Sequence, residues 1–264
     1  MELKLKNKTA LVTGSTAGIG FAIAKSLAME GANVFINGRT AARVNQALDR
    51  LKAETGNPSI KGIVADFSDK EEVRQLTDQL PEVDILINNV GIFEPKAFTD
   101  ITDEDWFTFF EVNVLSGIRL SRAYFNRMIQ KNWGRIIFIS SESGIQIPEE
   151  MIHYGVTKAA QIAAARGLAE LTKGTAVTVN TVLPGPTLSE GAGTFIKDLA
   201  AKDSKTMEEV ETDFFRTTRP TSILQRFIDP DEIASLVTYL SSDLSIATNG
   251  AAVRADGGMI KSAF

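Results

Sequence analysis

A tyrosine and a lysine stand four residues apart in this chain, Tyr154 and Lys158, at the start of an alanine-rich stretch. Ser141 lies thirteen residues upstream of Tyr154, directly after the apolar run 136–139. A phenol has an unperturbed pKa of about 10, but a positive charge one helical turn away favours the phenolate. Bringing that pKa to about 7 takes roughly 4 kcal/mol, which a lysine, a hydroxyl and a cofactor charge could supply together. The spacing therefore predicts an acid–base catalyst built on a tyrosine.

A glycine-rich turn follows the first expected strand and opens the first expected helix. It reads Thr13-Gly14-Ser15-Thr16-Ala17-Gly18-Ile19-Gly20. Gly14 allows a tight turn, Gly18 lets the backbone approach a pyrophosphate, and Gly20 lets the helix pack closely on the strand. Because free amides at a helix N-terminus attract phosphate, the turn predicts a dinucleotide site. An ordinary β–α turn of small residues is the alternative interpretation.

The end of the second expected strand distinguishes between the two nicotinamide cofactors. An NAD enzyme usually has an acidic residue there, which binds the ribose 2′-hydroxyl. This chain has Gly38-Arg39 at that place. Gly38 carries no carboxylate that would repel a 2′-phosphate, and the guanidinium of Arg39 offers several hydrogen-bond donors to bind one. NADP(H) is favoured and NAD(H) is the alternative, since no second basic residue stands between Ser15 and Ala17. A surface arginine that opens the next helix is the structural alternative.

Short β-rich runs alternate with helical stretches along almost the whole chain. The expected strands are 9–13, 32–37, 60–65, 83–88, 135–140, 176–182 and 251–255. The expected helices run from the glycine turn to residue 30, over 40–55, 69–80 and 103–131, onward from 153, and over 231–241. This alternation predicts βαβ crossovers. The fold class is therefore α/β: a single domain over residues 1–264 with a doubly wound, seven-stranded parallel sheet in three layers, a Rossmann fold.

One charged segment, 190–220, interrupts the alternation between the sixth strand and its next helix. It is long enough to fold over the carboxyl edge of the sheet, where ligands bind in such folds, and predicts a small substrate lid. A surface excursion is the alternative. Candidates for a partly apolar substrate pocket are Phe93, Glu94, Ile145, Ile147, Met151, Phe195, Phe214 and Phe215. The three lid aromatics could equally pack the lid onto the domain.

Composition excludes several classes of function. A net charge of −5 and a pI near 5.1 argue against a nucleic-acid partner, and the absence of cysteine excludes disulfides and thiolate chemistry. No His/Asp/Glu grouping has the spacing of a catalytic metal site. The first residues lack a signal-peptide core, and no apolar run approaches the ~18 residues of a membrane span. We expect a soluble, cytoplasmic protein that binds a small molecule.

Three residues beside the catalytic candidates have ambiguous environments. Glu142 and Ser143 follow Ser141 and could line the pocket or face solvent. His153 precedes Tyr154, and neighbours on a helix point about 100° apart. It is therefore not placed to act as the partner of the tyrosine, and we expect a pocket-rim or capping residue rather than a base.

Taken together, these motifs resemble the single-domain short-chain dehydrogenase/reductase family, and the resemblance covers almost the whole chain. The matching motifs are Thr13-Gly14-x-x-x-Gly18-x-Gly20, Asp66, Asn88-Asn89-Val90-Gly91, Asn113, Ser141, Tyr154-x-x-x-Lys158, Pro184-Gly185 and Asp256-Gly257-Gly258. Each motif alone is weak evidence. Their order and spacing together are strong evidence.

The resemblance implies a role for each catalytic residue. Tyr154 would exchange a proton with the substrate oxygen, and Ser141 would hydrogen bond that oxygen. Lys158 would bind the nicotinamide ribose and lower the pKa of Tyr154. Asn113 would position a water that links Lys158 to solvent, through a local disturbance of its long helix.

The resemblance also implies a set of cofactor contacts. Asp66 would face the adenine, and residues 89–91 would line the cofactor site. Ser189 stands where the family commonly has threonine. The full expected set is Gly14, Ser15, Thr16, Gly18, Ile19, Gly20, Arg39, Asp66, Phe67, Asn89, Val90, Gly91, Tyr154, Lys158, Pro184, Gly185, Thr187 and Ser189.

The sequence thus predicts an NADP(H)-dependent oxidoreductase that interconverts a ketone or aldehyde and an alcohol by hydride transfer. A nucleotide-binding regulator or scaffold of the same fold is the alternative. A nucleotide-sugar epimerase or dehydratase is disfavoured because it needs a larger C-terminal domain.

The alanine-rich helix after Tyr154 has small side chains that allow a second helix to approach closely. The resemblance implies a homotetramer through this helix and the Asn113 helix, and packing within the monomer is the alternative. The sequence does not identify the substrate.

Overall fold

The sheet of this protein has seven parallel strands, as predicted. The computed structural model describes residues 2–189, 193, 200 and 205–263. The strand order is β3-β2-β1-β4-β5-β6-β7, and every neighbouring pair is parallel. The strands are β1 (Thr9–Val12), β2 (Asn33–Gly38), β3 (Ile60–Val64), β4 (Ile85–Asn88), β5 (Gly134–Ile139), β6 (Val177–Pro184) and β7 (Ala252–Ala255). The order reverses between β1 and β4, which is where a doubly wound sheet opens a ligand crevice at its carboxyl edge.

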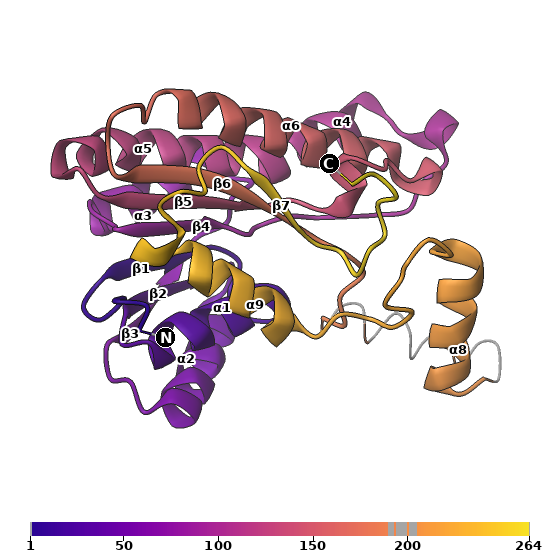
Figure 1. Ribbon diagram of the computed structural model, residues 1–264, viewed down its shortest axis with the longest axis horizontal. Coiled ribbons are helices and arrows are strands. Elements are labelled where there is room, and N and C mark those ends of the chain that lie inside the picture. The colour runs from indigo at the N-terminus through magenta and orange to yellow at the C-terminus, as the bar shows by residue number, and fades with distance from the viewer. Residues whose placement is uncertain (1, 190–192, 194–199, 201–204, 264) are drawn as a thin grey trace.

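Helices cover both faces of the sheet and make the expected three layers in one domain (Figure 1). One face carries α1 (Gly18–Met29), α2 (Ala41–Thr55) and α9 (Pro230–Leu240). The other carries α3 (Lys70–Gln79), α5 (Ser116–Lys131) and α6 (Ile152–Glu170), and α4 (Asp103–Phe110) packs against α6. Short helical turns complete the series: η1 (Phe98–Asp100), η2 (Glu111–Leu115), η3 (Glu142–Gly144), η4 (Glu149–Met151), η5 (Phe214–Thr218) and η6 (Asp243–Ser245).

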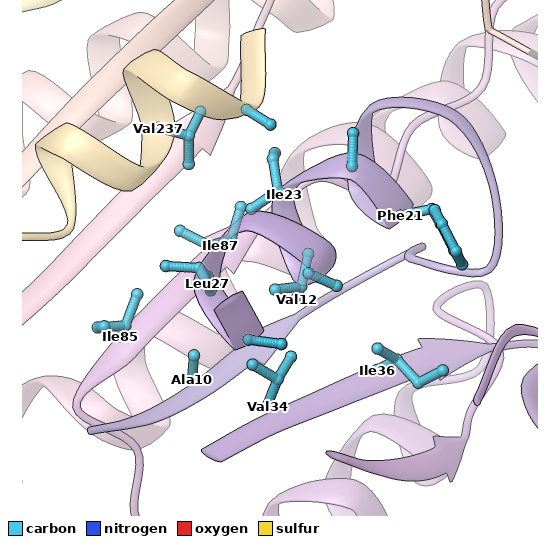
Figure 2. Close-up of a cluster of buried hydrophobic side chains, with 14 of the residues drawn as sticks. Ala10, Val12, Phe21, Ile23, Leu27, Val34, Ile36, Ile85, Ile87 and Val237 are labelled. Atoms are coloured by element: carbon cyan, nitrogen blue, oxygen red, sulfur yellow. The ribbon is translucent and has the colours of Figure 1, made fainter. Parts of the chain in front are cut away.

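The two apolar layers follow from the alternation of side chains along the strands. Ala10 and Val12 of β1 point to the layer of α1 and α9, whereas Leu11 belongs to the opposite layer. Figure 2 shows Ile23 and Val237 reaching the same cluster from the two helices. Because a parallel sheet covered on both faces has no wet side, its strands are nearly continuous apolar runs.

The expected single helix over 103–131 is wrong in one detail. It is divided into α4 and α5 by the π-helical turn η2, and Asn113 lies in that turn. The side chain of Asn113 bonds the backbone of Ile92 and the hydroxyl of Thr157, which lie outside its own helix. The disturbance implied by the family resemblance is therefore present, and π-turns of this kind are frequent at functional sites.

The expected lid is only partly covered by the described residues. Its described portion forms α8 (Met207–Asp213) and η5, and Figure 1 shows α8 set apart from the sheet. Phe214 and Phe215 pack on Phe227, with ring centroids 5.0 and 5.1 Å away. These two aromatics therefore hold the segment together, and Phe195 lies outside the described residues.

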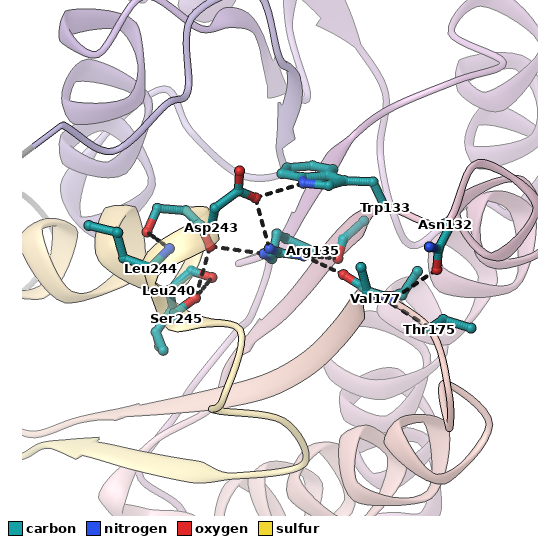
Figure 3. A network of polar contacts seen from close by, with 12 residues as sticks. Asn132, Trp133, Arg135, Thr175, Val177, Leu240, Asp243, Leu244 and Ser245 are labelled. Atoms are coloured by element: carbon teal, nitrogen blue, oxygen red, sulfur yellow. Dashed lines mark hydrogen bonds and ion pairs between the residues drawn. The ribbon is translucent and has the colours of Figure 1, made fainter.

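A buried arginine ties the amino end of the sheet together, opposite the ligand edge (Figure 3). Arg135 of β5 is almost fully buried and donates to the carbonyl oxygens of Ser242 and Ala176, at 3.1 and 2.8 Å. It also pairs with Asp243, which accepts a hydrogen bond from Trp133 at 2.8 Å. This network anchors the segment that leads from α9 to β7.

Candidate active site

A cavity of about 550 Å³ lies among residues that follow the carboxyl ends of the central strands. Ten of the expected site residues line it: Ile19, Asn89, Gly91, Ser141, Tyr154, Lys158, Pro184, Gly185, Thr187 and Ser189. The rest of the wall is mainly apolar and includes Phe93, Pro95, Met151, Val210, Phe214 and Phe227. Of the expected pocket residues, Glu94, Ile145, Ile147 and Phe215 do not line it. The two isoleucines are exposed instead, and Phe215 is buried in the aromatic packing of the lid segment.

The three central candidates converge at one end of this cavity. Ser141 follows β5, Tyr154 lies in the first turn of α6, and Lys158 lies one turn further on. The Nζ atom of Lys158 lies 5.5 Å from the centroid of the Tyr154 ring. It donates to the carbonyl oxygen of Ile139 at 3.0 Å and to Oε1 of Gln161 at 3.3 Å. The buried ammonium is thus held beneath the tyrosine ring.

The protein groups of the site do not by themselves favour the phenolate, and the expected fall in the Tyr154 pKa also required a cofactor charge. Burial raises the pKa of Tyr154 well above its ordinary value, and the carboxylate of Glu142 adds to that rise, while the Ser141 hydroxyl opposes it. Burial lowers the pKa of Lys158 to about 8, against the influence of Glu142. Without a further positive charge, Tyr154 is therefore a protonated hydrogen-bond donor.

Asn113 is linked to Lys158 by a residue that the sequence analysis missed. The carbonyl oxygen of Asn113 accepts a hydrogen bond from Nε2 of Gln161 at 2.5 Å, and Gln161 also accepts from Lys158. The role of Asn113 in positioning a water stays a prediction. The available signal was a polar residue three positions after Lys158 on an otherwise small-residue helix, because such residues share a helix face.

The glycine turn leaves an open helix N-terminus. Ala17 is the N-cap of α1 and has no side chain that can bond the first amides, and the first turn contains no acidic residue. A Cβ atom on Gly20 would lie 2.5 Å from both the Asn89 side chain and the Gly14 carbonyl oxygen. The Nδ2 atom of Asn89 donates to the carbonyl oxygens of Thr13 and Gly14. The turn is thus tightly held, and its uncapped amides fit a pyrophosphate.

Two of the expected cofactor contacts, Ser15 and Phe67, have buried side chains. Ser15 is fully buried; its hydroxyl donates to the carbonyl oxygen of Val12, and its amide donates to that of Asn37. The side chain of Phe67 belongs to the hydrophobic core. Asn37 was overlooked: its amide side chain bonds Gly14, Ile63 and Ala65, and so joins the glycine turn to the third strand.

Gly38 and Arg39, on which the predicted cofactor choice depends, stand at and directly after the end of β2. A Cβ atom on Gly38 would lie 2.5 Å from Cγ2 of Thr16, so an acidic residue does not fit there. Arg39 is exposed and makes no hydrogen bond or ion pair to another described residue. Bonds from Ser68 hold the pKa of Asp66 below its ordinary value, and the charge of Arg39 contributes to the shift.

The other cofactor candidates lie along the same edge. A Cβ atom on Gly18 would lie 3.0 Å from the Ser189 side chain, and one on Gly14 would lie 3.1 Å from Val90. The Thr187 hydroxyl donates to the Gly185 carbonyl oxygen at 2.8 Å. The glycine turn and the segment after β6 therefore lie against each other at the edge of the cavity.

His153 is neither a pocket-rim residue nor a cap. Its side chain is fully buried, with the ring centroid 4.0 Å from that of Phe109 and 6.1 Å from that of Trp106. Neither ring nitrogen has a hydrogen-bond partner among the described residues, and burial lowers its pKa. Met151 is the N-cap of α6. His153 is therefore a neutral core residue where α4 meets α6.

Known proteins resemble this chain over most of its length. A family model described as short chain dehydrogenase matches residues 8–200. The chain is 53% identical over 264 residues to the uncharacterized oxidoreductase YvaG of Bacillus subtilis, and both chains are fully covered. It is 34% identical over 272 residues to D-beta-hydroxybutyrate dehydrogenase of Cupriavidus necator, covering 97% of this chain and 99% of that protein.

The structural comparison extends over the whole fold. The chain aligns with L-sorbose reductase of Gluconobacter frateurii, solved with NADPH and L-sorbose, at a TM-score of 0.93 and 28% identity, covering 99% of this chain and 100% of the other. The protein belongs to the short-chain dehydrogenase/reductase family. It is an NAD(P)-dependent oxidoreductase, as the sequence predicted. No helix in the described part of the chain has the length and apolar character to cross a membrane.

Proposed function

We propose that this protein is an NADP(H)-dependent carbonyl reductase or alcohol dehydrogenase. The observation that carries the proposal is the convergence of Ser141, Tyr154 and Lys158 on one cavity wall, beside the uncapped N-terminus of α1. The alternative, a nucleotide-binding regulator of the same fold, predicts cofactor binding without turnover. A panel of ketones, aldehydes and alcohols with both cofactors distinguishes the two.

In this proposal, the side chains stabilise and protonate the substrate oxygen. A bound nicotinamide supplies or accepts the hydride. Tyr154 donates its proton to the oxygen as negative charge develops there, and Ser141 hydrogen bonds the same atom. Lys158 stabilises the phenolate that results. The apolar wall excludes water from the reaction.

Arg39 carries the proposed preference for NADP(H). Arg39 follows β2 directly, and Gly38 at the end of that strand contributes no carboxylate. The structural relative solved with NADPH supports this choice.

Arg39→Ala is therefore expected to weaken NADPH binding by about 10- to 100-fold, the value of a charge-assisted hydrogen bond. NADH lacks the 2′-phosphate, so its dissociation constant should change little. Fluorescence titration of both cofactors checks this result, with Arg43→Ala as a control on the neighbouring helix. Equal losses for NADPH and NADH would contradict the proposed role.

The proposal includes a homotetramer assembled through α5 and α6. Ala163 and Gly167 are exposed four residues apart on α6, and nothing lies within 4 Å of a Cβ atom placed on Gly167. Small residues at this spacing let a second helix approach closely. Light scattering of the purified protein should give four times the chain mass, and Gly167→Arg should reduce it. A monomer with the wild-type sequence would contradict the proposal.

A further inference from the structure

A carboxylate occupies the catalytic end of the cavity, and the proposed reaction has not used it. Glu142 lies in η3, is 6% exposed and lines the cavity. Its Oε2 atom accepts a hydrogen bond from the Ser141 hydroxyl at 2.5 Å, and its Oε1 atom accepts one from Ser143 at 3.2 Å. A buried carboxylate beside the substrate oxygen is costly to maintain unless something offsets its charge.

The nearest cation offsets that charge only in part. The Nε atom of Arg219 lies 4.0 Å from Oε1 of Glu142, which is too long for a hydrogen bond. Arg219 is instead bonded to Glu150, at 2.9 Å. A carboxylate has about four acceptor positions on its two oxygens. Glu142 can therefore take a further donor from the cavity.

The bond from Ser141 creates a conflict with catalysis. A hydroxyl has one proton, and that of Ser141 is donated to Glu142. Ser141 cannot donate the same proton to a substrate carbonyl oxygen. The conflict is resolved if the substrate brings its own donor, which bonds Glu142 and releases the Ser141 proton for the carbonyl oxygen.

We propose that the substrate is an uncharged carbonyl compound with a hydroxyl on the adjacent carbon, and that Glu142 accepts the hydrogen bond of that hydroxyl. This inference rests on the proposed function, because it places the carbonyl oxygen at Ser141 and Tyr154. The two oxygens of such a substrate stand on adjacent carbon atoms, and the Ser141 and Glu142 side chains that would bind them are themselves within hydrogen-bond distance of each other. Anionic 2-oxo acids are disfavoured because their carboxylate would approach Glu142 and Glu150.

Two ketones of nearly equal shape test this specificity. In 3-hydroxy-2-butanone a hydroxyl stands where 3-methyl-2-butanone has a methyl group. With NADPH, the wild type should reduce the hydroxyketone with a kcat/KM about 10- to 100-fold higher than that for 3-methyl-2-butanone. The reason is that the methyl ketone leaves the Glu142 carboxylate without a hydrogen-bond donor. Glu142→Met should remove most of this preference. Glu142→Gln, which retains an amide acceptor, should lose part of it.

Glu149→Gln is the control, since Glu149 is an exposed carboxylate that does not line the cavity. It should keep the wild-type preference. Circular dichroism and the NADPH dissociation constant establish that each variant is folded.

The outcomes separate the two proposals. If carbonyl reduction depends on Tyr154 but the wild type shows no preference for the hydroxyketone, or Glu142→Met retains that preference, this inference is overturned and the proposed function stands. If pyruvate is the better substrate, the inference is also overturned. If no carbonyl is reduced in a Tyr154-dependent way, the proposed function fails and the inference fails with it.

Discussion

Tyr154→Phe is expected to lower kcat for carbonyl reduction by about 10²- to 10⁴-fold, the usual contribution of a positioned general acid. The change removes the one hydroxyl that can protonate the substrate oxygen and leaves the ring in place. That ring packs edge-on against Phe93, with centroids 6.3 Å apart, so the fold should be preserved. Because burial raises the pKa of the phenol and keeps it protonated, no buried charge is lost. Steady-state oxidation of NADPH measures the effect.

Tyr239→Phe provides the control for this substitution. Tyr239 lies in α9, outside the cavity lining, and its hydroxyl makes only a long 3.4 Å contact to the Leu244 carbonyl oxygen. This variant should retain wild-type turnover. Turnover of Tyr154→Phe within a factor of about two of the wild type would exclude tyrosine acid–base catalysis, since a general acid contributes far more.

Lys158→Met is expected to lower kcat/KM by about 10²- to 10³-fold, because a preorganised positive charge is lost from the reacting centre. Methionine matches the length of the lysine stem, so the packing against α6 and β5 should persist. The cofactor should also bind less tightly if Lys158 contacts the ribose. Steady-state kinetics and fluorescence titration measure the two effects separately.

The same substitution should leave a signature in the pH dependence of stability. The pKa of Lys158 is about 8 in the folded protein against an ordinary value of 10.5. Below pH 8 both states carry the charge, and the folded state bears its desolvation cost. Between these two pKa values the unfolded chain binds a proton that the folded protein has released, so stability rises with pH. The wild type should gain roughly 3 kcal/mol relative to Lys158→Met across that window.

Urea denaturation at about pH 7 and about pH 10 checks this difference, and two-state unfolding should hold for both proteins. Lys25→Met is a suitable control. Lys25 pairs with Asp231 on the surface, and surface ion pairs contribute little to stability. A wild-type curve parallel to that of Lys158→Met over this range would mean that the ammonium is not desolvated.

The fold could be predicted because local patterns agree with the tertiary structure along most of the chain. Each apolar run pairs as a strand, and Thr40, Asp69 and Asp229 cap helices that begin near the expected positions. The division of the 103–131 helix had no local signal. It depends on contacts of Asn113 with residues far along the chain, and no helical periodicity encodes them.

In the candidate site, some residues could be predicted from local sequence, and others depend on contacts with distant parts of the chain. Ser141, Tyr154 and Lys158 could be singled out because their chemistry and spacing are visible in the sequence. The burial of His153 depends on how α4 packs against α6, and its neighbours Phe109 and Trp106 lie over forty residues away. Likewise, the low exposure of Glu142 depends on the tertiary arrangement that brings Arg219 beside it. Such environments follow from packing and not from local pattern.

The ionisation of Tyr154 also required the structure. Spacing indicated that Lys158 favours the phenolate, but burial and Glu142 raise the pKa of Tyr154 and outweigh that influence among the protein groups. The proposed mechanism therefore needs the additional positive charge that an oxidised nicotinamide brings. The phenol of Tyr154 should therefore become acidic only when the oxidised cofactor is bound.

An ultraviolet difference titration of tyrosinate, in wild type and Tyr154→Phe, with and without saturating NADP⁺, tests this central claim most directly. The account predicts that the Tyr154 phenol of the free protein stays protonated beyond the ordinary tyrosine pKa of about 10, and that NADP⁺ moves its titration below that value. If NADP⁺ binds and the phenol still titrates above the ordinary range, Tyr154 is not the acid–base group of this site.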